Sequence, residues 1–226
     1  EGIWEQGTGN RPQGIFASEG IGGMCHWEDV SMSQPGHIGD GNRTIFDHGY
    51  YTYNYATTTD DCIVWDASAH GIMSRSVGVT QGCLVMQCPV GITGGHGGQI
   101  VYNNVCIGGS NQTPTGANRQ IWTGSGTYNR VVDNLILAEP SILGTAVAMN
   151  IASKSYADNQ GNFTVDADWE VIIENNTVRG AFPVRFDPER TDEIGDLSFV
   201  RNVLDCGVSD LIQSDDDLSL IPSLSI

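Results

Sequence analysis

The densest group of side chains able to transfer protons lies between residues 47 and 75. Asp47 and His48 precede a glycine and a run of tyrosines, and His70 precedes a second glycine 22 residues after His48. Histidine changes its charge near neutral pH, so it is well suited to take a proton from a substrate or to return one. Acid–base catalysis is therefore the chemistry that this segment could perform, provided that the fold brings the two histidines together.

A repeat along the chain indicates how these residues are positioned. Seven times an apolar stretch runs into an Asn, Asp or Cys, at Asp29, Asp66, Cys88, Asn104, Asn134, Asn176 and Asn202. The intervals vary from 16 to 42 residues, and repeats of roughly 20 to 45 residues are typical of solenoids. The sequence thus predicts a solenoid in which these residues stack at one turn, each side-chain amide bonding the next.

A second set of strand-like segments alternates with this column, for example at 48–53, 70–75, 90–93 and 119–123. Coils that carry one strand of each set would stack as an all-β parallel β-helix, with neighbouring strands about 4.8 Å apart. Alternation along the strands predicts a core column of Tyr50, Ile72, Ile92, Ile121, Val147 and Val184. It predicts an outer column of Tyr51, Met73, Thr93, Trp122, Ala148 and Arg185, with Tyr53, Arg75, Asn150 and Asp187 two positions further along.

The outer face of these strands suits a carbohydrate. Flat aromatic rings stack on sugar rings, and charged groups bind hydroxyls and carboxylates. The predicted substrate-binding residues are Tyr51, Trp122, Arg185 and Asp187. The same alternation puts His48 on the side of Tyr50, so a second interpretation stays open, in which His48 and His70 form an inward, hydrogen-bonded structural pair.

The repeat resembles the right-handed parallel β-helix superfamily of carbohydrate-active proteins, which includes pectate lyases, polygalacturonases, mannuronan epimerases and phage tailspikes. The resemblance extends over nearly the whole chain and implies a right-handed solenoid of about seven coils with an Asn/Asp ladder. It also implies that the polar insertions at 109–118, 154–168 and 187–196 are loops that wall a substrate groove. One domain over residues 1–226 is expected, and whether an N-terminal cap precedes it is left open.

The segment from Asp47 to Arg75 resembles a region of mannuronan C5-epimerases in which an Asp-Pro-His motif is followed one coil later by a His-Gly strand. Here Asp47 meets His48 directly, without the proline. The resemblance implies that His48 abstracts the C5 proton of a uronate, that Tyr51 or Tyr53 donates a proton, and that Arg75 neutralises the substrate carboxylate. The predicted catalytic residues are His48, Tyr53, Arg75, Asp47 and His70.

A second local resemblance is to polygalacturonases, whose Asp-Asp-Cys and Gly-His-Gly motifs are similar to Asp60-Asp61-Cys62 and Gly95-His96-Gly97. In that family Asp carboxylates protonate the leaving group and activate water. His96 lies 35 residues after Asp61, which is more than one coil. A glycoside hydrolase that uses Asp60, Asp61 or Asp187 is one alternative function. A non-catalytic glycan-binding or structural surface protein, of the adhesin or tailspike kind, is another.

The net charge of −17 disfavours some partners. Because 27 carboxylates oppose 10 Lys and Arg side chains, a nucleic acid would be repelled. No apolar run is long enough to cross a membrane as a helix. The partner expected from the predicted aromatic and charged outer face is a polysaccharide. Acidic runs at 187–196 and 214–217 could gather oxygen ligands around Ca²⁺. No other cofactor and no metal-binding residue is predicted.

Six cysteines and four glycosylation sequons favour a secreted or cell-surface protein with one or two disulfides. Buried free thiols are the alternative that the sequence leaves open, since cysteine is often buried. The function predicted from the sequence is a secreted polysaccharide lyase or epimerase that acts on a uronate-containing glycan by proton abstraction.

Overall fold

The computed structural model describes the backbone of residues 2–7, 12–18, 24–28, 31–33, 48–53, 56–67, 70–74, 77–94, 99–108, 118–123, 128–138, 146–152, 169–180, 182–187, 194–206, 212–214 and 223–225. Side chains are described for most of those between 48 and 205. The predicted insertions at 109–118, 154–168 and 187–196 lie largely outside these residues, and their described positions, 118, 187 and 194–196, belong to strands and not to loops.

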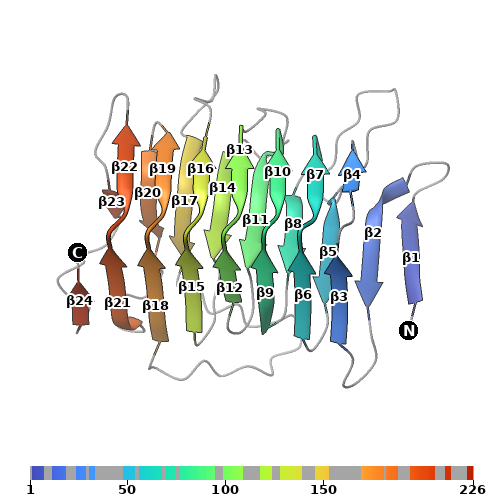
Figure 1. Ribbon diagram of the computed structural model, residues 1–226, viewed down its shortest axis with the longest axis horizontal. Coiled ribbons are helices and arrows are strands. Elements are labelled where there is room, and N and C mark those ends of the chain that lie inside the picture. Colours follow the sequence, from blue (N-terminus) through green and yellow to red (C-terminus); the bar gives the residue numbers. More distant parts are fainter. Residues whose placement is uncertain are drawn as a thin grey trace.

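Strands form three sheets, which the chain visits in turn (Figure 1). Sheet A contains β1 (Gly2–Gly7), β2 (Pro12–Ser18), β5 (Tyr50–Tyr53), β8 (His70–Ser74), β11 (Val90–Gly94), β14 (Asn118–Thr123), β17 (Ala146–Ala152), β20 (Phe182–Asp187) and β23 (Ile212–Ser214). Sheet B contains β3 (Met24–Glu28), β6 (Ala56–Asp60), β9 (Val77–Gln81), β12 (Gln99–Tyr102), β15 (Tyr128–Val132), β18 (Trp169–Glu174), β21 (Ile194–Val200) and β24 (Ser223–Ser225). Sheet C contains β4 (Ser31–Ser33), β7 (Ile63–Trp65), β10 (Leu84–Met86), β13 (Val105–Ile107), β16 (Leu135–Leu137), β19 (Thr177–Gly180) and β22 (Val203–Cys206).

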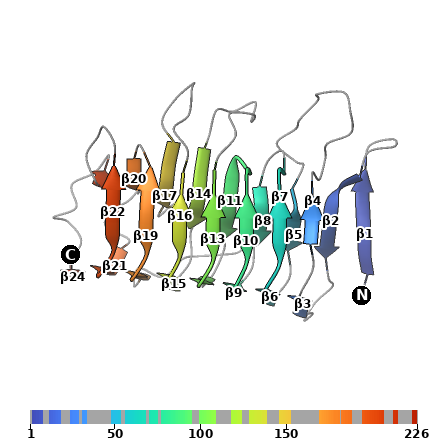
Figure 2. The same cartoon turned by 45° about the horizontal axis from the view of Figure 1, so that its top comes forward.

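Strand pairing shows how the coils stack. Apart from β1, which pairs with β2 in antiparallel fashion, each strand pairs in parallel with the strand three places later in the chain. The coils therefore follow one another along one axis, as Figures 1 and 2 show. The prediction of an all-β chain with parallel sheets is confirmed, and the arrangement is consistent with a β-solenoid. None of the described residues forms a helix long and apolar enough to span a membrane.

The inner column of sheet A agrees with the predicted core, with one exception. Tyr50, Ile72, Ile92, Ile121 and Val184 are at most 1% exposed. Val147 does not belong to this column, because Met149 pairs with both Ile121 and Val184 and is fully buried. Residues two apart in a strand occupy equivalent positions in the alternation, so the pattern alone cannot detect a shift of two residues.

The same shift corrects two outward positions in β17. Ala148, predicted to be exposed, is fully buried. Asn150 pairs with Trp122 and with Arg185, so it lies in the first outer column and not two positions further along.

Hydrogen bonds link four asparagines at the corner between sheets B and C. Asn104 donates through Nδ2 to Asn134 Oδ1 at 3.0 Å, Asn134 donates to Asn176 Oδ1 at 2.9 Å, and Asn176 donates to Asn202 Oδ1 at 2.9 Å. Each Oδ1 also accepts the backbone N–H of the preceding asparagine. These amides satisfy buried donors and acceptors at a corner where the strand ladder is interrupted.

Cysteines continue this Asn column in the earlier coils. The residue that follows each member of the column donates its backbone N–H to the carbonyl oxygen of the column member one coil earlier. The bonds run from Leu135 to Asn104, from Val105 to Cys83 and from Leu84 to Cys62, each at 2.9 Å. The predicted assignment of Asp66 and Cys88 to the column is therefore wrong. Asp66 lies at the other end of β7, where its N–H donates to Met86 O. Asp29 lies outside the described residues.

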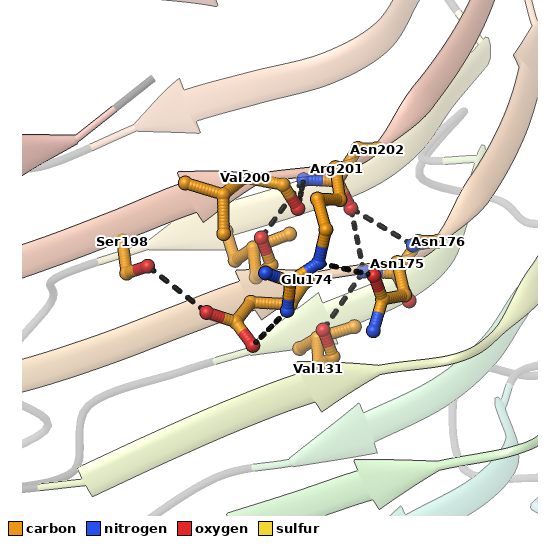
Figure 3. A network of polar contacts seen from close by, with 9 residues as sticks. Val131, Glu174, Asn175, Asn176, Ser198, Val200, Arg201 and Asn202 are labelled. Atoms are coloured by element: carbon orange, nitrogen blue, oxygen red, sulfur yellow. Dashed lines mark hydrogen bonds and ion pairs between the residues drawn. The ribbon is translucent and has the colours of Figure 1, made fainter.

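The residue before each column position has a left-handed backbone. Its φ lies between 50° and 64° at Asp61, Gly82, Asn103, Asp133, Asn175 and Arg201. Glycine, Asn and Asp tolerate this conformation, whereas arginine rarely adopts it. Arg201 donates from Nε to Asn175 Oδ1 at 2.8 Å and pairs with Glu174 at 3.3 Å, which joins the last coils (Figure 3).

Four cysteines lie in the core as thiols. Cys62, Cys83, Cys88 and Cys106 are at most 1% exposed, and none of them is in a disulfide. The predicted disulfides are therefore not found among the cysteines whose side chains are described, which exclude Cys25 and Cys206. Burial raises the pKa of the Cys106 thiol, and a hydrogen bond with Cys62 together with burial raises that of Cys83. Burial also raises the pKa of the Tyr50 hydroxyl.

These raised pKa values predict a loss of stability at alkaline pH. The folded chain keeps Cys83, Cys106 and Tyr50 protonated, whereas the unfolded chain releases their protons near pH ~8.5 for Cys and ~10 for Tyr. The free energy of unfolding should be level below about pH 8 and then fall by up to about 1.4 kcal/mol per pH unit for each ionised group. Urea denaturation at successive pH values measures the slope. Cys106→Ala should make it shallower, and a level profile up to about pH 10 would contradict the prediction.

Candidate functional site

His48 and His70 meet on the outer face of sheet A. Their rings are 4.9 Å apart, centroid to centroid, and nearly perpendicular at 81°. The His48 ring also stacks on Tyr51 at 5.2 Å, with an angle of 26° between the planes. All three side chains are half-buried. Two predicted catalytic residues and one predicted substrate-binding residue thus form a single cluster.

Two glycines explain why the histidines face outward. A Cβ on Gly49 would lie 2.6 Å from Val64 Cγ1, and a Cβ on Gly71 would lie 2.5 Å from Val85 Cγ1. Both valines are fully buried in the core, so the two glycines face inward. The next residues, Tyr50 and Ile72, also face inward, so strict alternation is broken at this corner. The inward direction expected in the second interpretation is therefore wrong, whereas His70 does form a hydrogen bond, with Thr93.

The inward glycines lead to a stability prediction. Gly71→Ala should lower the free energy of unfolding by about 1–3 kcal/mol, because the new methyl group overlaps Val85 Cγ1 and lies 2.9 Å from the Gly91 carbonyl oxygen. Gly180→Ala is a matched control, since its Cβ would lie 3.2 Å from the nearest atom and should cost less. Denaturation midpoints measure both variants. An equal loss in the two would contradict the proposed overlap.

The next two coils extend the cluster. His70 Nδ1 is 2.8 Å from Thr93 Oγ1, a hydrogen-bond distance, and the Trp122 ring lies 6.3 Å from the His70 ring. The Arg119 guanidinium carbon lies 4.8 Å from the Trp122 ring centroid, a cation–π distance. Thr93 is 5% exposed, whereas Arg119 and Trp122 are half-buried. The cluster therefore spans β5, β8, β11 and β14.

Arg119 and the Thr93–His70 contact were not predicted from the sequence. Strand register supplies the missing information, because Val90 pairs with both His70 and Arg119 and so places them in one column. The signal in the sequence is spacing. Arg119 precedes Trp122 by three residues, as His48 precedes Tyr51.

The remaining predicted site residues are described only in part. Asp47 and Arg75 lie outside the described residues, as does His96. Tyr53, Arg185 and Asp187 have a described backbone without described side chains. Asn150 pairs with Trp122 on one side and with Arg185 on the other, so the backbone of Arg185 lies in the same column as Trp122. Asp187 pairs with Ala152, two positions further along the strands.

Two of the three carboxylates proposed for a hydrolase, Asp60 and Asp61, do not join the cluster. Asp60 ends β6 and accepts a hydrogen bond from Gln81 Nε2 at 3.1 Å, and Asp61 follows it as an exposed residue with a φ of 50°. Both lie at the corner between sheets B and C, whereas the histidines are on sheet A. Over the described ranges, no three His, Cys, Asp or Glu side chains gather closely enough to hold a metal ion. The acidic loops proposed for Ca²⁺ lie largely outside those ranges.

Sheet C presents an apolar outer face. Over β7, β10, β13 and β16 the outward residues are Ile63, Trp65, Leu84, Met86, Val105, Ile107, Leu135 and Leu137. None of these side chains titrates, so this part of the surface offers no acid–base chemistry.

The candidate site is therefore the outer face of sheet A around His48, Tyr51, His70, Arg119 and Trp122. It combines two imidazoles in contact with aromatic rings and one guanidinium. No protein-family model, no curated protein and no solved structure matches this chain.

Proposed function

We propose that the protein is a secreted polysaccharide-active enzyme that removes a proton from a uronate-containing glycan on the outer face of sheet A. The observation that carries the proposal is the contact between His48 and His70, with Tyr51 stacked on His48. An imidazole is an effective base near neutral pH, and a phenol beside it supplies the proton that the leaving group needs. Aromatic rings next to the base give a sugar a flat surface to stack on.

Arg119 is the cation proposed to stabilise the intermediate. Removing the C5 proton places negative charge on the uronate carboxylate, and a nearby guanidinium lowers the energy of that charge. Arg119 lies on Trp122, so one residue pair could bind both the carboxylate and the sugar ring. Arg75 remains a proposed second cation.

A lyase is favoured over an epimerase. An epimerase must remove a proton from one face of the sugar ring and return one to the opposite face, which requires an acid across the ring from the base. His48 and Tyr51 instead lie side by side at 5.2 Å. Elimination with base and acid on the same side of the sugar fits this arrangement.

The experiment is an activity screen on uronate polymers, including alginate, pectate and glycosaminoglycans. A lyase creates unsaturated uronate ends, which absorb in the ultraviolet, while an epimerase exchanges the C5 proton with solvent deuterium without new ends. Reducing ends released without ultraviolet absorbance would indicate a hydrolase instead. No turnover of any kind across the panel would contradict the enzymatic proposal.

Ionic strength should affect this activity strongly. The net charge of −17 repels a polyuronate, and salt screens that repulsion, the Debye length falling from ~30 Å at ~0.01 M to ~8 Å at ~0.15 M. We therefore expect kcat/KM to rise with added NaCl over this range, and to change little for a neutral glycan. If kcat/KM for a polyuronate instead falls as NaCl is added, repulsion between the protein and the polymer does not limit their association.

A non-catalytic glycan-binding protein is the second candidate. Within the described part of the site, the side chains are aromatic, imidazole, hydroxyl and guanidinium groups, without a carboxylate. This composition suits sugar stacking and disfavours the hydrolase, which needs two carboxyl groups. Glycan binding that survives His48→Ala, with no turnover, would support the binder.

The finer features of the fold belong to the same proposal. We propose a right-handed coil of about seven turns, because crossovers between parallel strands are right-handed in about 98% of cases. The proposed compartment is extracellular or the cell surface, and the proposed partner is a polysaccharide rather than a nucleic acid or a membrane.

A further inference from the structure

We propose that Cys62 and Cys83 form a disulfide between two successive coils when the chain folds in an oxidising medium. The bond would be a covalent modification of the core, separate from the proposed activity. Both residues are thiols in this structure.

Strand register places the two cysteines directly over one another. Ile63 pairs with Leu84, so the residues that precede them, Cys62 and Cys83, occupy equivalent positions in adjacent coils. The N–H of Leu84 donates to the carbonyl of Cys62 at 2.9 Å, which continues the pairing to the cysteines. In-register neighbours on adjacent strands lie about 4.8 Å apart, within the Cα separation of roughly 4.4–6.8 Å found in disulfides.

Both side chains are buried in the core at this corner. Cys62 is fully buried and Cys83 is 1% exposed. The thiols interact with carbonyls at the same corner, Cys62 Sγ at 3.2 Å from Asp60 O and Cys83 Sγ at 3.2 Å from Gln81 O. A hydrogen bond with Cys62 is the main cause of the raised pKa of Cys83.

The other two described cysteines, Cys88 and Cys106, are not paired with a cysteine by strand register. Cys106 lies in β13, where its neighbours in the adjacent strands are Val85 and Ile136. In the Asn column, the residue that follows Cys83 in the next coil is Asn104. Cys88 lies beyond the other end of β10, with its thiol 3.3 Å from Met86 O. The register therefore selects one pair among the four described cysteines.

The bond would join the two coils that carry the histidines. His48 and Cys62 belong to one coil, and His70 and Cys83 belong to the next. In the reaction two S–H bonds break and one S–S bond forms. The two protons and two electrons pass to a second disulfide, such as oxidised glutathione, whose S–S bond breaks to give two thiols. Because the thiols are buried, the exchange must occur during folding.

The test is to refold the full chain from denaturant with either a glutathione redox buffer or an excess of reductant. Free thiols are then blocked under denaturing conditions, and the products are analysed by peptide mapping. Tryptic cleavage after Arg75 puts Cys62 and Cys83 on separate peptides, and fragmentation separates Cys83 from Cys88 and Cys106. We expect a linked peptide that contains Cys62 and Cys83, lighter than the two reduced peptides by two hydrogen atoms.

Stability provides a second readout. The oxidised protein should unfold at a higher denaturant concentration than the reduced protein, because the bond restricts the unfolded chain. Cys62→Ser and Cys83→Ser should each abolish this difference, whereas Cys106→Ala, as a matched buried control, should preserve it. The wild-type peptide map decides the question even if a serine variant fails to fold. Blocked thiols at both Cys62 and Cys83 in the oxidised sample, or a bond from either one to another cysteine, would overturn the proposal.

Discussion

His48→Ala is expected to lower the turnover of a uronate polymer by about 10²–10⁴-fold, the usual contribution of a positioned general base. The imidazole of His48 is half-buried between His70 and Tyr51, so alanine removes the base and opens a gap beside both rings. Initial rates of ultraviolet absorbance from unsaturated ends measure the loss. Substrate binding should weaken much less than turnover, since Tyr51 and Trp122 keep their rings.

Asp205→Ala is a suitable control for this experiment. Asp205 lies on sheet C and forms an ion pair with Arg179 at 3.4 Å, in which both side chains are more than half exposed. Its removal should leave the rate close to wild type, because exposed ion pairs contribute little to stability. If His48→Ala folds with a wild-type melting temperature and keeps a wild-type rate, His48 is not the base.

Asn176→Ala should cause a large loss of stability. The Asn176 side chain donates to Val131 O at 2.8 Å and to Asn202 Oδ1 at 2.9 Å (Figure 3). Its own Oδ1 accepts the backbone N–H of Asn134 at 3.0 Å. Alanine leaves the Asn134 N–H and the Val131 carbonyl buried without these partners. Each such group costs about 1–3 kcal/mol, so we expect the free energy of unfolding to fall by about 3 kcal/mol.

The neighbouring residue provides the control for Asn176. Asn175 is exposed, has a φ of 56° and accepts one surface hydrogen bond from Arg201. Asn175→Gly should change stability by only a few tenths of a kcal/mol, because glycine adopts this backbone conformation readily. Urea denaturation followed by tryptophan fluorescence compares the variants. Equal stabilities for the two would show that the linked amides contribute little.

Strand order and the inner column of sheet A could be predicted because both depend on local spacing. Apolar residues at equivalent positions of successive coils, such as Ile72 and Ile92, must be buried whichever way the coil closes. Membership of the Asn column could not be predicted reliably in the early coils, where cysteine replaces asparagine. Cys83 and Cys88 are both small, buried and preceded by turn residues, so only the pairing of the backbone separates them.

Four of the predicted site residues lie together in the structure, whereas the direction of His48 could not be derived from alternation along the strand. His48, His70, Tyr51 and Trp122 were selected by residue type and spacing, and the structure brings these four together. Alternation nevertheless placed His48 on the inner side, because it assumes that successive side chains point to opposite faces. That assumption fails at Gly49, where the absence of a side chain lets the backbone lie against Val64.

The sequence by itself determined the all-β architecture with parallel sheets, since the spacing of apolar residues repeats from coil to coil. It also determined which residue types are available for proton transfer. Only the tertiary structure decided which way those residues face and which strands they share. Their direction depends on how sheet C packs against the corner glycines of sheet A, through Val64 and Val85. Such a contact joins residues of different sheets, and no pattern along a single strand can specify it.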